Sequence, residues 1–160
     1  MEANLRFKLM GGHEHPDDSV HWQQHVQNVL SAAGRGHGGA RDRVVGLLAG
    51  ERCAMSVVEI EEAFRDCGHR IGRASIYRVL DLLLEHGLVE RVEVGDGQAR
   101  FERTQPGGEH HHHLVCQRCG QLIAFDDPGL ERAIERLSTR LGARVQSHEV
   151  LLRGECGRCV

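Results

Sequence analysis

Residues 56–102 read SVVEIEEAFRDCGHRIGRASIYRVLDLLLEHGLVERVEVGDGQARFE, and this stretch decides the fold of the chain. Ser56 followed by Glu59 forms a capping box, which predicts that a helix begins here. The glycine-bounded stretch Gly68–Gly72 predicts a tight turn, and the apolar spacing after it predicts a second helix that ends at Gly87.

A hairpin follows these two helices. Two strands are expected at Leu88–Val94 and Gln98–Glu102, joined by Gly95-Asp96-Gly97. Asp-Gly between alternating apolar residues is a strong signal for a tight turn between antiparallel strands. Helix, turn, helix and hairpin are together the plan of a winged helix-turn-helix domain.

Apolar stripes place this pattern in a larger N-terminal domain. Two more helices are expected upstream, one from about Trp22 to Gly34 and a short one that ends at Gly50. The residues expected to face the core recur at helical spacing: Trp22, Val26, Val29, Leu30, Ala33, Val44, Leu47, Leu48, Ile60, Ala63, Phe64, Cys67, Ile76, Val79, Leu80, Leu83 and Leu84. Residues 1–20 have no such period and are expected to form a flexible arm, and residues 21–103 the winged-helix domain.

A second, smaller unit is expected after a linker at residues 104–109. Residues 110–160 predict strands at Leu114–Cys116 and Gln121–Phe125, a helix capped by Asp127, and a strand at Arg144–Leu152. The apolar face of that helix consists of Leu130, Ile134, Leu137 and Leu141. A unit of this size cannot build a strong core by itself, so we expect a metal or a partner chain to stabilise it. The fold class is therefore α+β.

Composition sets limits on the function. The chain has 160 residues, a formal net charge of −3 and 40% hydrophobic residues, so a DNA-binding role must rest on local pattern. No apolar run is long enough to span a membrane, and residues 1–12 lack the apolar segment of a secretory signal. We expect a cytoplasmic protein, in which the six cysteines are thiols or metal ligands.

The most specific chemical motif is a pair of CxxC sequences. Cys116 and Cys119 form the first pair, and Cys156 and Cys159 form the second. Four thiolates are the ligand set of a tetrahedral structural zinc site, and such a site has no open position for catalysis. We expect Zn²⁺ here, joining the end of the second unit to its first hairpin.

Four consecutive histidines, residues 110–113, form a second candidate metal site. In an extended chain, successive side chains point to opposite sides. His111 and His113 would then face one way and His110 and His112 the other, so one run could serve two sites.

The second helix of the helix-turn-helix carries positive charge. Three arginines and no acid lie between Arg70 and Val79, together with Ser75 and Tyr77. Arginine neutralises phosphates and can read guanine in the major groove. These arginines, including Arg73, are candidates for contacts with DNA, and Arg41 could add a contact with the backbone.

These motifs together resemble the ferric uptake regulator family. The resemblance rests on GRASIYRVL at residues 72–80, HGLV at 86–89, the histidine run with the first CxxC, and the terminal CxxC. It implies a homodimer with an N-terminal winged-helix domain and a C-terminal dimerisation domain, which represses metal-homeostasis genes at a palindromic operator when metal is bound.

The resemblance also implies roles for particular residues. Ser75, Tyr77 and Arg78 match positions of the recognition helix that approach DNA. The four cysteines match the structural zinc site. His111 and His113 match a regulatory site at the hinge, which Glu102 completes in iron-type members and Glu90 in zinc-type members. A second site in the dimerisation domain is matched by His110, His112, Glu131 and His148. The chain departs from the pattern at Ala54, Thr104 and Ala124, where members of one type or the other carry a metal ligand.

Two other functions remain as alternatives to a regulator. A metallohydrolase would use His111, His113 and Glu102 around an open metal position, but the sequence supplies no orienting triad for it. A zinc-stabilised buffering or interaction module would bind no DNA, and the arginines of the second helix argue against it. The sequence leaves open whether the regulatory ion is Zn²⁺, Fe²⁺ or Mn²⁺, and what roles Cys53 and the N-terminal arm have. It predicts no enzyme, no small organic substrate and no membrane partner.

Overall fold

The computed structural model describes residues 16–95, 97–104 and 111–160, so the N-terminal arm up to residue 15, the tip of the hairpin, most of the linker and His110 lie outside the described residues. Four helices come first along the chain: α1 (Pro16–Ala32), α2 (Gly39–Ala49), α3 (Val57–Asp66) and α4 (Arg73–Glu85). They pack around one apolar core that includes Trp22, Leu48, Ile60, Ile76 and Leu83.

Local signals in the sequence account for several helix ends. The Ser56 side chain accepts a hydrogen bond from the Glu59 backbone, and the Glu59 carboxylate accepts one from the Ser56 backbone, so the predicted capping box is confirmed. Gly87 adopts a positive φ of 64° directly after α4, a conformation that glycine reaches without steric cost.

The wing is a three-stranded antiparallel sheet in the order β1-β3-β2. The predicted hairpin corresponds to β2 (Val89–Glu93) and β3 (Ala99–Arg103). The short strand β1 (Met55–Ser56), which the sequence pattern did not reveal, pairs with the other edge of β3. Because β3 is the central strand, both its edges are hydrogen-bonded and its side chains are held at fixed positions.

The C-terminal unit contains a second three-stranded sheet, in the order β5-β4-β6, and one helix. Its strands are β4 (His112–Cys116), β5 (Leu122–Phe125) and β6 (Leu151–Gly154), and α5 (Pro128–Leu141) connects β5 to β6. Asp127 caps α5 through Leu130 N, with Pro128 in the first turn, as the sequence predicted.

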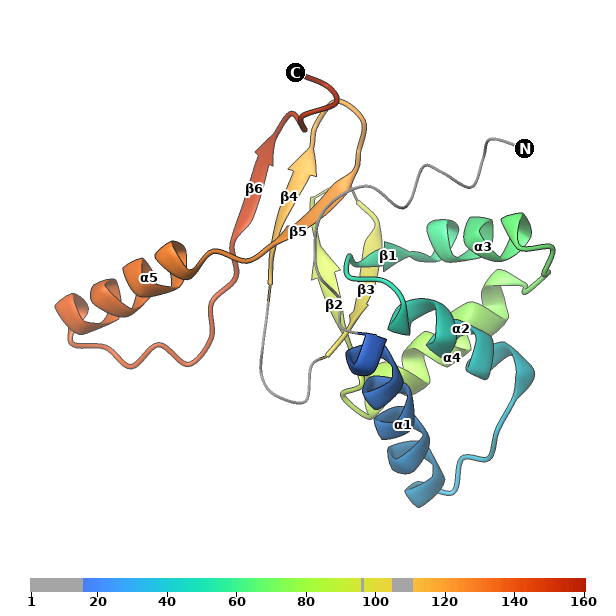
Figure 1. Cartoon of the computed structure of the whole chain (residues 1–160). Coiled ribbons are helices and arrows are strands. Elements are labelled where there is room, and N and C mark those ends of the chain that lie inside the picture. Colours follow the sequence, from blue (N-terminus) through green and yellow to red (C-terminus); the bar gives the residue numbers. More distant parts are fainter. Residues whose placement is uncertain (1–15, 96, 105–110) are drawn as a thin grey trace.

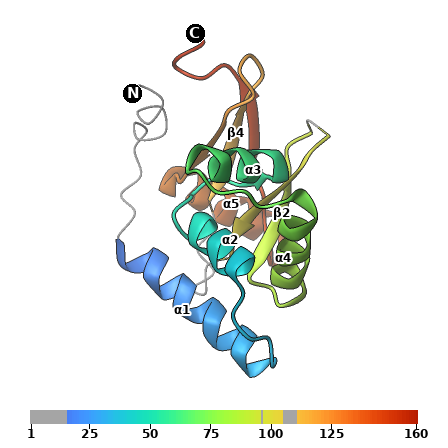
Figure 2. The same cartoon turned by 90° about the vertical axis from the view of Figure 1, so that its right-hand side faces the viewer.

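The two units lie against each other. In Figure 1, α5 extends away from the four N-terminal helices, and in Figure 2 those helices lie in front of the C-terminal sheet. A small apolar cluster joins the units, with Ala54, Val92 and Val94 from the N-terminal one. Leu122 packs with them from the C-terminal one, and Arg153 on β6 donates to the Val94 carbonyl.

Three sequence expectations were wrong in detail. Helix α1 begins at Pro16, so the expected arm of residues 1–20 overlaps the helix by five positions, residues 16–20. Cys67 is exposed at the end of α3 rather than in the core, because the helix ends one residue earlier. The last strand is only Leu151–Gly154 rather than Arg144–Leu152, since its pairing with β4 begins at His113 and Leu151.

Candidate metal centres and DNA-binding helix

Three groups of potential metal ligands occur among the described residues, and each holds its ligand atoms within 4.8 Å of one another. The first is the cysteine group, Cys116, Cys119, Cys156 and Cys159. The second is Glu102, His111 and His113, which we call the hinge group, and the third is His112, Glu131 and His148.

The four sulfurs of the cysteine group converge at the end of the C-terminal sheet. Cys116 ends β4, and Cys156 and Cys159 follow β6, its parallel neighbour, so the sheet brings the two motifs together. The Sγ atoms of Cys119 and Cys156 are 3.8 Å apart, and all six cysteines of the chain are free thiols. This separation excludes a disulfide between these two cysteines and fits one edge of a tetrahedral thiolate site.

The protonation of this group favours a bound cation. Backbone hydrogen bonds from Cys156 and Cys119 lower the pKa of the Cys116 thiol to about 6. Hydrogen bonds with the neighbouring Cys156 and Cys119 sulfurs raise the pKa of Cys159 to about 12, and charge repulsion from Cys116 adds to the increase. A divalent cation removes that repulsion, so the donor set fits the predicted structural zinc.

The hinge group is built around one buried carboxylate. His111 Nε2 and His113 Nε2 donate to the same oxygen, Glu102 Oε2, at 3.1 and 3.0 Å. Burial by itself raises the pKa of Glu102, but the hydrogen bonds from both imidazoles outweigh it and lower the pKa to about 2. The same hydrogen bond raises the pKa of His111. Glu102 is therefore an ionised ligand held in place before any metal binds.

The spacing of these three atoms fits a small divalent ion. Zinc–nitrogen and zinc–oxygen bonds of about 2 Å place neighbouring ligands of a tetrahedron roughly 3.3 Å apart. The observed separations of 3.0 and 3.1 Å are close to that edge length. An ion that replaces the two shared protons would require only small movements of the three side chains.

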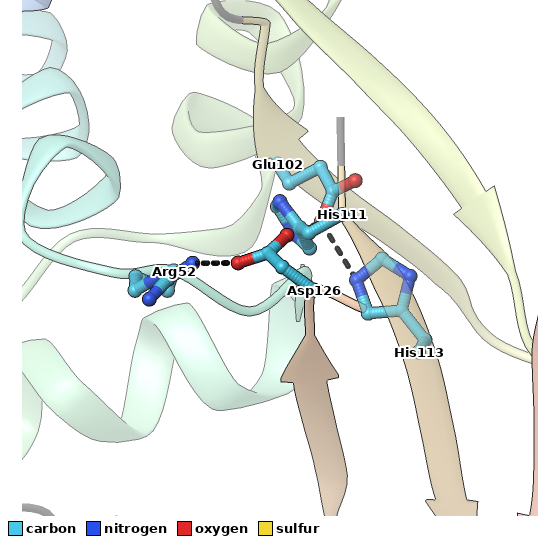
Figure 3. Close-up of polar contacts among 5 residues, drawn as sticks. All are labelled: Arg52, Glu102, His111, His113 and Asp126. Carbon is cyan, nitrogen blue, oxygen red and sulfur yellow. Dashed lines mark hydrogen bonds and ion pairs between the residues drawn. The ribbon is translucent and has the colours of Figure 1, made fainter. Parts of the chain in front are cut away.

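The hinge group joins the two units of the chain (Figure 3). Glu102 lies on the central strand of the wing, while His111 precedes β4 and His113 belongs to it. The alternation expected for the histidine run is confirmed for the described residues, since His111 and His113 share one group and His112 belongs to another.

Glu90 lies beside this group without belonging to it. It faces Glu102 directly across the β2–β3 pair, and burial followed by the charge of Glu102 raises its pKa. The structure thus brings Glu102, and not Glu90, together with the two histidines.

The third group lies wholly within the C-terminal unit. His112 Nε2 is 2.8 Å from Glu131 Oε1, and His148 Nε2 is 3.1 Å from Glu131 Oε2. Glu131 comes from the first turn of α5, and His148 from the segment before β6. The fourth residue expected here, His110, lies outside the described residues.

Sequence reasoning missed two residues at the edge of the hinge group. Arg52 Nη2, from the loop between α2 and β1, contacts Asp126 Oδ2 at 2.8 Å. Besides the hydrogen bond that His111 donates to Glu102, the electrostatic influences on the pKa of His111 include an increase from Asp126 and a decrease from Arg52. The sequence offered one signal for Asp126. It lies two residues after Ala124, and residues two apart in an extended chain point to the same side.

Helix α4 presents the expected DNA-contacting side chains on its exposed face. Ile76, Val79, Leu80 and Leu83 face the core, whereas Tyr77 is 49% exposed. Arg78 donates to the Ala74 carbonyl and the Ser75 hydroxyl, and Arg73 contacts Glu61 Oε2 at 2.7 Å. Arg41, on α2, reaches the Arg35 carbonyl, so these arginines have exchangeable partners at the surface.

A winged-helix domain joined to a small α/β domain with thiolate and imidazole–carboxylate groups defines a metal-responsive DNA-binding regulator. The comparisons agree with this class. The model of the ferric uptake regulator family matches residues 37–153, and the chain belongs to that family.

Individual relatives support the assignment. The ferric uptake regulation protein of Bacillus subtilis (strain 168) is 32% identical over 114 residues, 71% of this chain and 76% of the relative. The Escherichia coli (strain K12) ferric uptake regulation protein is 34% identical over 102 residues, 64% of this chain and 68% of the relative. The crystal structure of the Vibrio cholerae ferric uptake regulator superposes with a TM-score of 0.69 at 30% identity, covering 82% of this chain and 99% of that one.

None of the helices in the described ranges is both long and apolar enough to cross a membrane.

Proposed function

We propose that the hinge group is the regulatory metal site of this repressor, and that its occupation allows a homodimer to bind a palindromic DNA operator. The observation that carries the proposal is the origin of the ligands. Glu102 belongs to the DNA-binding unit, and His111 and His113 belong to the other unit.

The mechanism follows from this geometry. The buried Glu102 carboxylate and the neutral imidazoles of His111 and His113 would hold a divalent ion, which supplies the positive charge between them. Glu102 meets both histidines only at one angle between the units, so ligation stabilises that angle over the others. In a dimer, the angle sets the distance between the two α4 helices, which must lie about one DNA turn apart, or a multiple of it, to enter successive major grooves.

The α5 face supports a dimer formed by the C-terminal units. No residue of α5 is buried within the chain, and Leu137 and Leu141 are 43% and 66% exposed. An apolar helical stripe with this exposure is typical of a surface that a partner covers. A second copy of the chain satisfies the expectation that this small unit needs a partner.

The two other groups have supporting roles in this proposal. The cysteine group holds a structural zinc that joins Cys159, near the chain end, to β4 and thereby stabilises the small sheet. The group of His112, Glu131 and His148, with His110, is a second divalent-metal site that ties α5 to the sheet. Two nitrogens and one oxygen in the hinge group suit Zn²⁺, Fe²⁺ or Mn²⁺. The DNA target places the protein in the cytoplasm of a bacterial cell, acting as a regulator and not an enzyme.

The test is DNA binding by protein that retains its structural zinc but lacks other metal, titrated with Zn²⁺, Fe²⁺ and Mn²⁺ at fixed salt. One ion is expected to increase operator affinity, and the variant with both His111→Ala and His113→Ala is expected to remain a folded dimer without that response. A variant that responds like the wild type refutes the hinge assignment. Equal DNA binding with and without every ion supports a constitutive binder or a metal buffer instead.

A further inference from the structure

The hinge group supplies three protein ligands, and a tetrahedral ion needs a fourth. The strand that faces the histidines carries no donor at the position paired with His113, because that residue is Ala124. The question is which neighbouring side chain of this chain fills the remaining position.

Strand register identifies a candidate. His112 pairs with Phe125 and His113 pairs with Ala124, and continuing this antiparallel register one residue past the ends of both strands places His111 opposite Asp126. Side chains two residues apart on a strand share a face. The Asp126 side chain is therefore expected on the side of the sheet that carries His111 and His113, next to His111.

The contacts of Asp126 agree with this placement. Arg52 contacts only one carboxylate oxygen, Oδ2, at 2.8 Å, and in Figure 3 the other oxygen lies on the side of His111. The Asp126 side chain is 55% exposed, so it is free to turn. An exposed ion pair of this kind contributes little to stability by itself, and a carboxylate loses little when it exchanges an arginine for a divalent ion.

We propose that Asp126 is the fourth protein ligand of the hinge ion, and that Arg52 is the counter-ion of this carboxylate that the metal ion displaces. The proposal rests on the function proposed above, because it completes the same site. It gives the ion two carboxylates and two imidazoles, with one ligand, Glu102, from the wing and three from the C-terminal unit.

Arg52 distinguishes this arrangement from a purely structural ion pair. If the pair only held the two units together, loss of either partner would weaken metal binding to a similar extent. If Asp126 is a ligand, Arg52 competes with the ion for the carboxylate and repels its charge. Removal of Arg52 then leaves metal affinity unchanged or increases it, whereas removal of the Asp126 charge decreases it.

Two other groups near the site are alternatives for the fourth position. The Cys53 thiol forms a hydrogen bond with the backbone of Ala124 and interacts with the charge of Glu102. Glu90 faces Glu102 across the wing. A thiolate ligand has its own charge-transfer absorption with Co²⁺, so spectroscopy separates Cys53 from the carboxylates.

The experiment uses the full chain with zinc retained in the cysteine group and Co²⁺ as the added ion. Affinity is measured by competition with a chelator, without DNA, and the visible spectrum reports the coordination. The variants are Asp126→Asn and Arg52→Gln. Glu93→Gln is the matched control, because it disrupts a similarly exposed ion pair, with Arg91 at 2.9 Å, on the wing. Circular dichroism checks that each variant is folded.

Asp126→Asn is expected to lower Co²⁺ affinity by roughly 100-fold or more, because loss of a direct ligand costs at least as much as loss of a group that only supports a ligand. It is also expected to change the visible band. Arg52→Gln and Glu93→Gln are expected to retain or exceed wild-type affinity. The inference is overturned if Asp126→Asn binds within about threefold of the wild type, or if Arg52→Gln falls in parallel with it. It is also overturned if a thiolate–cobalt band disappears in Cys53→Ser, or if Glu90→Gln alone reproduces the loss. Unchanged binding by the double histidine variant refutes the proposed function itself, which separates the two failures.

Discussion

Replacing Glu102 with glutamine tests how the hinge group is held together before metal binds. In the folded protein the pKa of Glu102 is lowered from 4.5 to about 2, despite burial, by hydrogen bonds from His111 and His113. A difference of about 2.5 pKa units corresponds to about 3 kcal/mol at about 1.4 kcal/mol per unit. Glu102 is only 5% exposed, so solvent screening reduces this value little. Glu102→Gln is therefore expected to lose up to about 3 kcal/mol of unfolding free energy where His111 is charged.

The pH dependence of this loss has a definite sign. Because the pKa of Glu102 is lowered, its contribution is present above 4.5 and is lost as the pH falls toward 2. Because the pKa of His111 is raised above 6.5, its contribution is present below 6.5 and is lost as the pH rises through the raised value. The advantage of the wild type should be largest between these limits and fall to about 1 kcal/mol, a neutral hydrogen bond, in alkaline solution.

Urea unfolding of wild type and Glu102→Gln at mildly acidic and at alkaline pH measures this difference. Both proteins keep the cysteine-group zinc, verified by metal analysis, so its own pH dependence cancels. A stability difference that increases with pH, or one below about 0.5 kcal/mol in mild acid, would show that the carboxylate does not hold the two imidazoles as described.

Three further predictions follow from the rest of the chain. Removal of zinc with a strong chelator, or Cys116→Ser, should unfold the C-terminal sheet while α1–α4 persist, because one metal joins the end of β4 to the segment after β6. Circular dichroism would show a partial loss of signal, and an unchanged spectrum would contradict this prediction. Leu141→Glu places a charge on the apolar face of α5 and should shift the dimer toward monomer in light scattering. Val20→Glu, at a similarly exposed position of α1, should not. Arg78→Ala should weaken operator binding and reduce the salt dependence by about one phosphate contact, while Arg65→Ala, on α3, should leave the slope unchanged.

Much of the candidate site could be predicted because local chemistry carries it. The two CxxC motifs specify their own ligand count, and the alternation of an extended histidine run separates His111 and His113 from His112 without any tertiary information. Helix caps at Ser56 and Asp127 are likewise local, since the hydrogen bonds span three residues.

Other features could not be read locally. Strand β1 has only two residues, too short for any period, and exists because β3 offers a free edge. Cys67 fits the helical stripe of α3, yet it is exposed because the helix ends at Asp66 and the chain turns away.

The sequence by itself therefore determined the order of the helices and of the strands other than β1, the cysteine group and the two faces of the histidine run, because each depends on hydrogen bonds or spacing within a few residues. Only the tertiary structure decided that Glu102, rather than Glu90, meets the histidines, and that Arg52 reaches Asp126, 74 residues along the chain. Those choices depend on how the wing docks against the C-terminal sheet. The docking is set by long-range packing of Ala54, Val92 and Leu122, which no local pattern encodes.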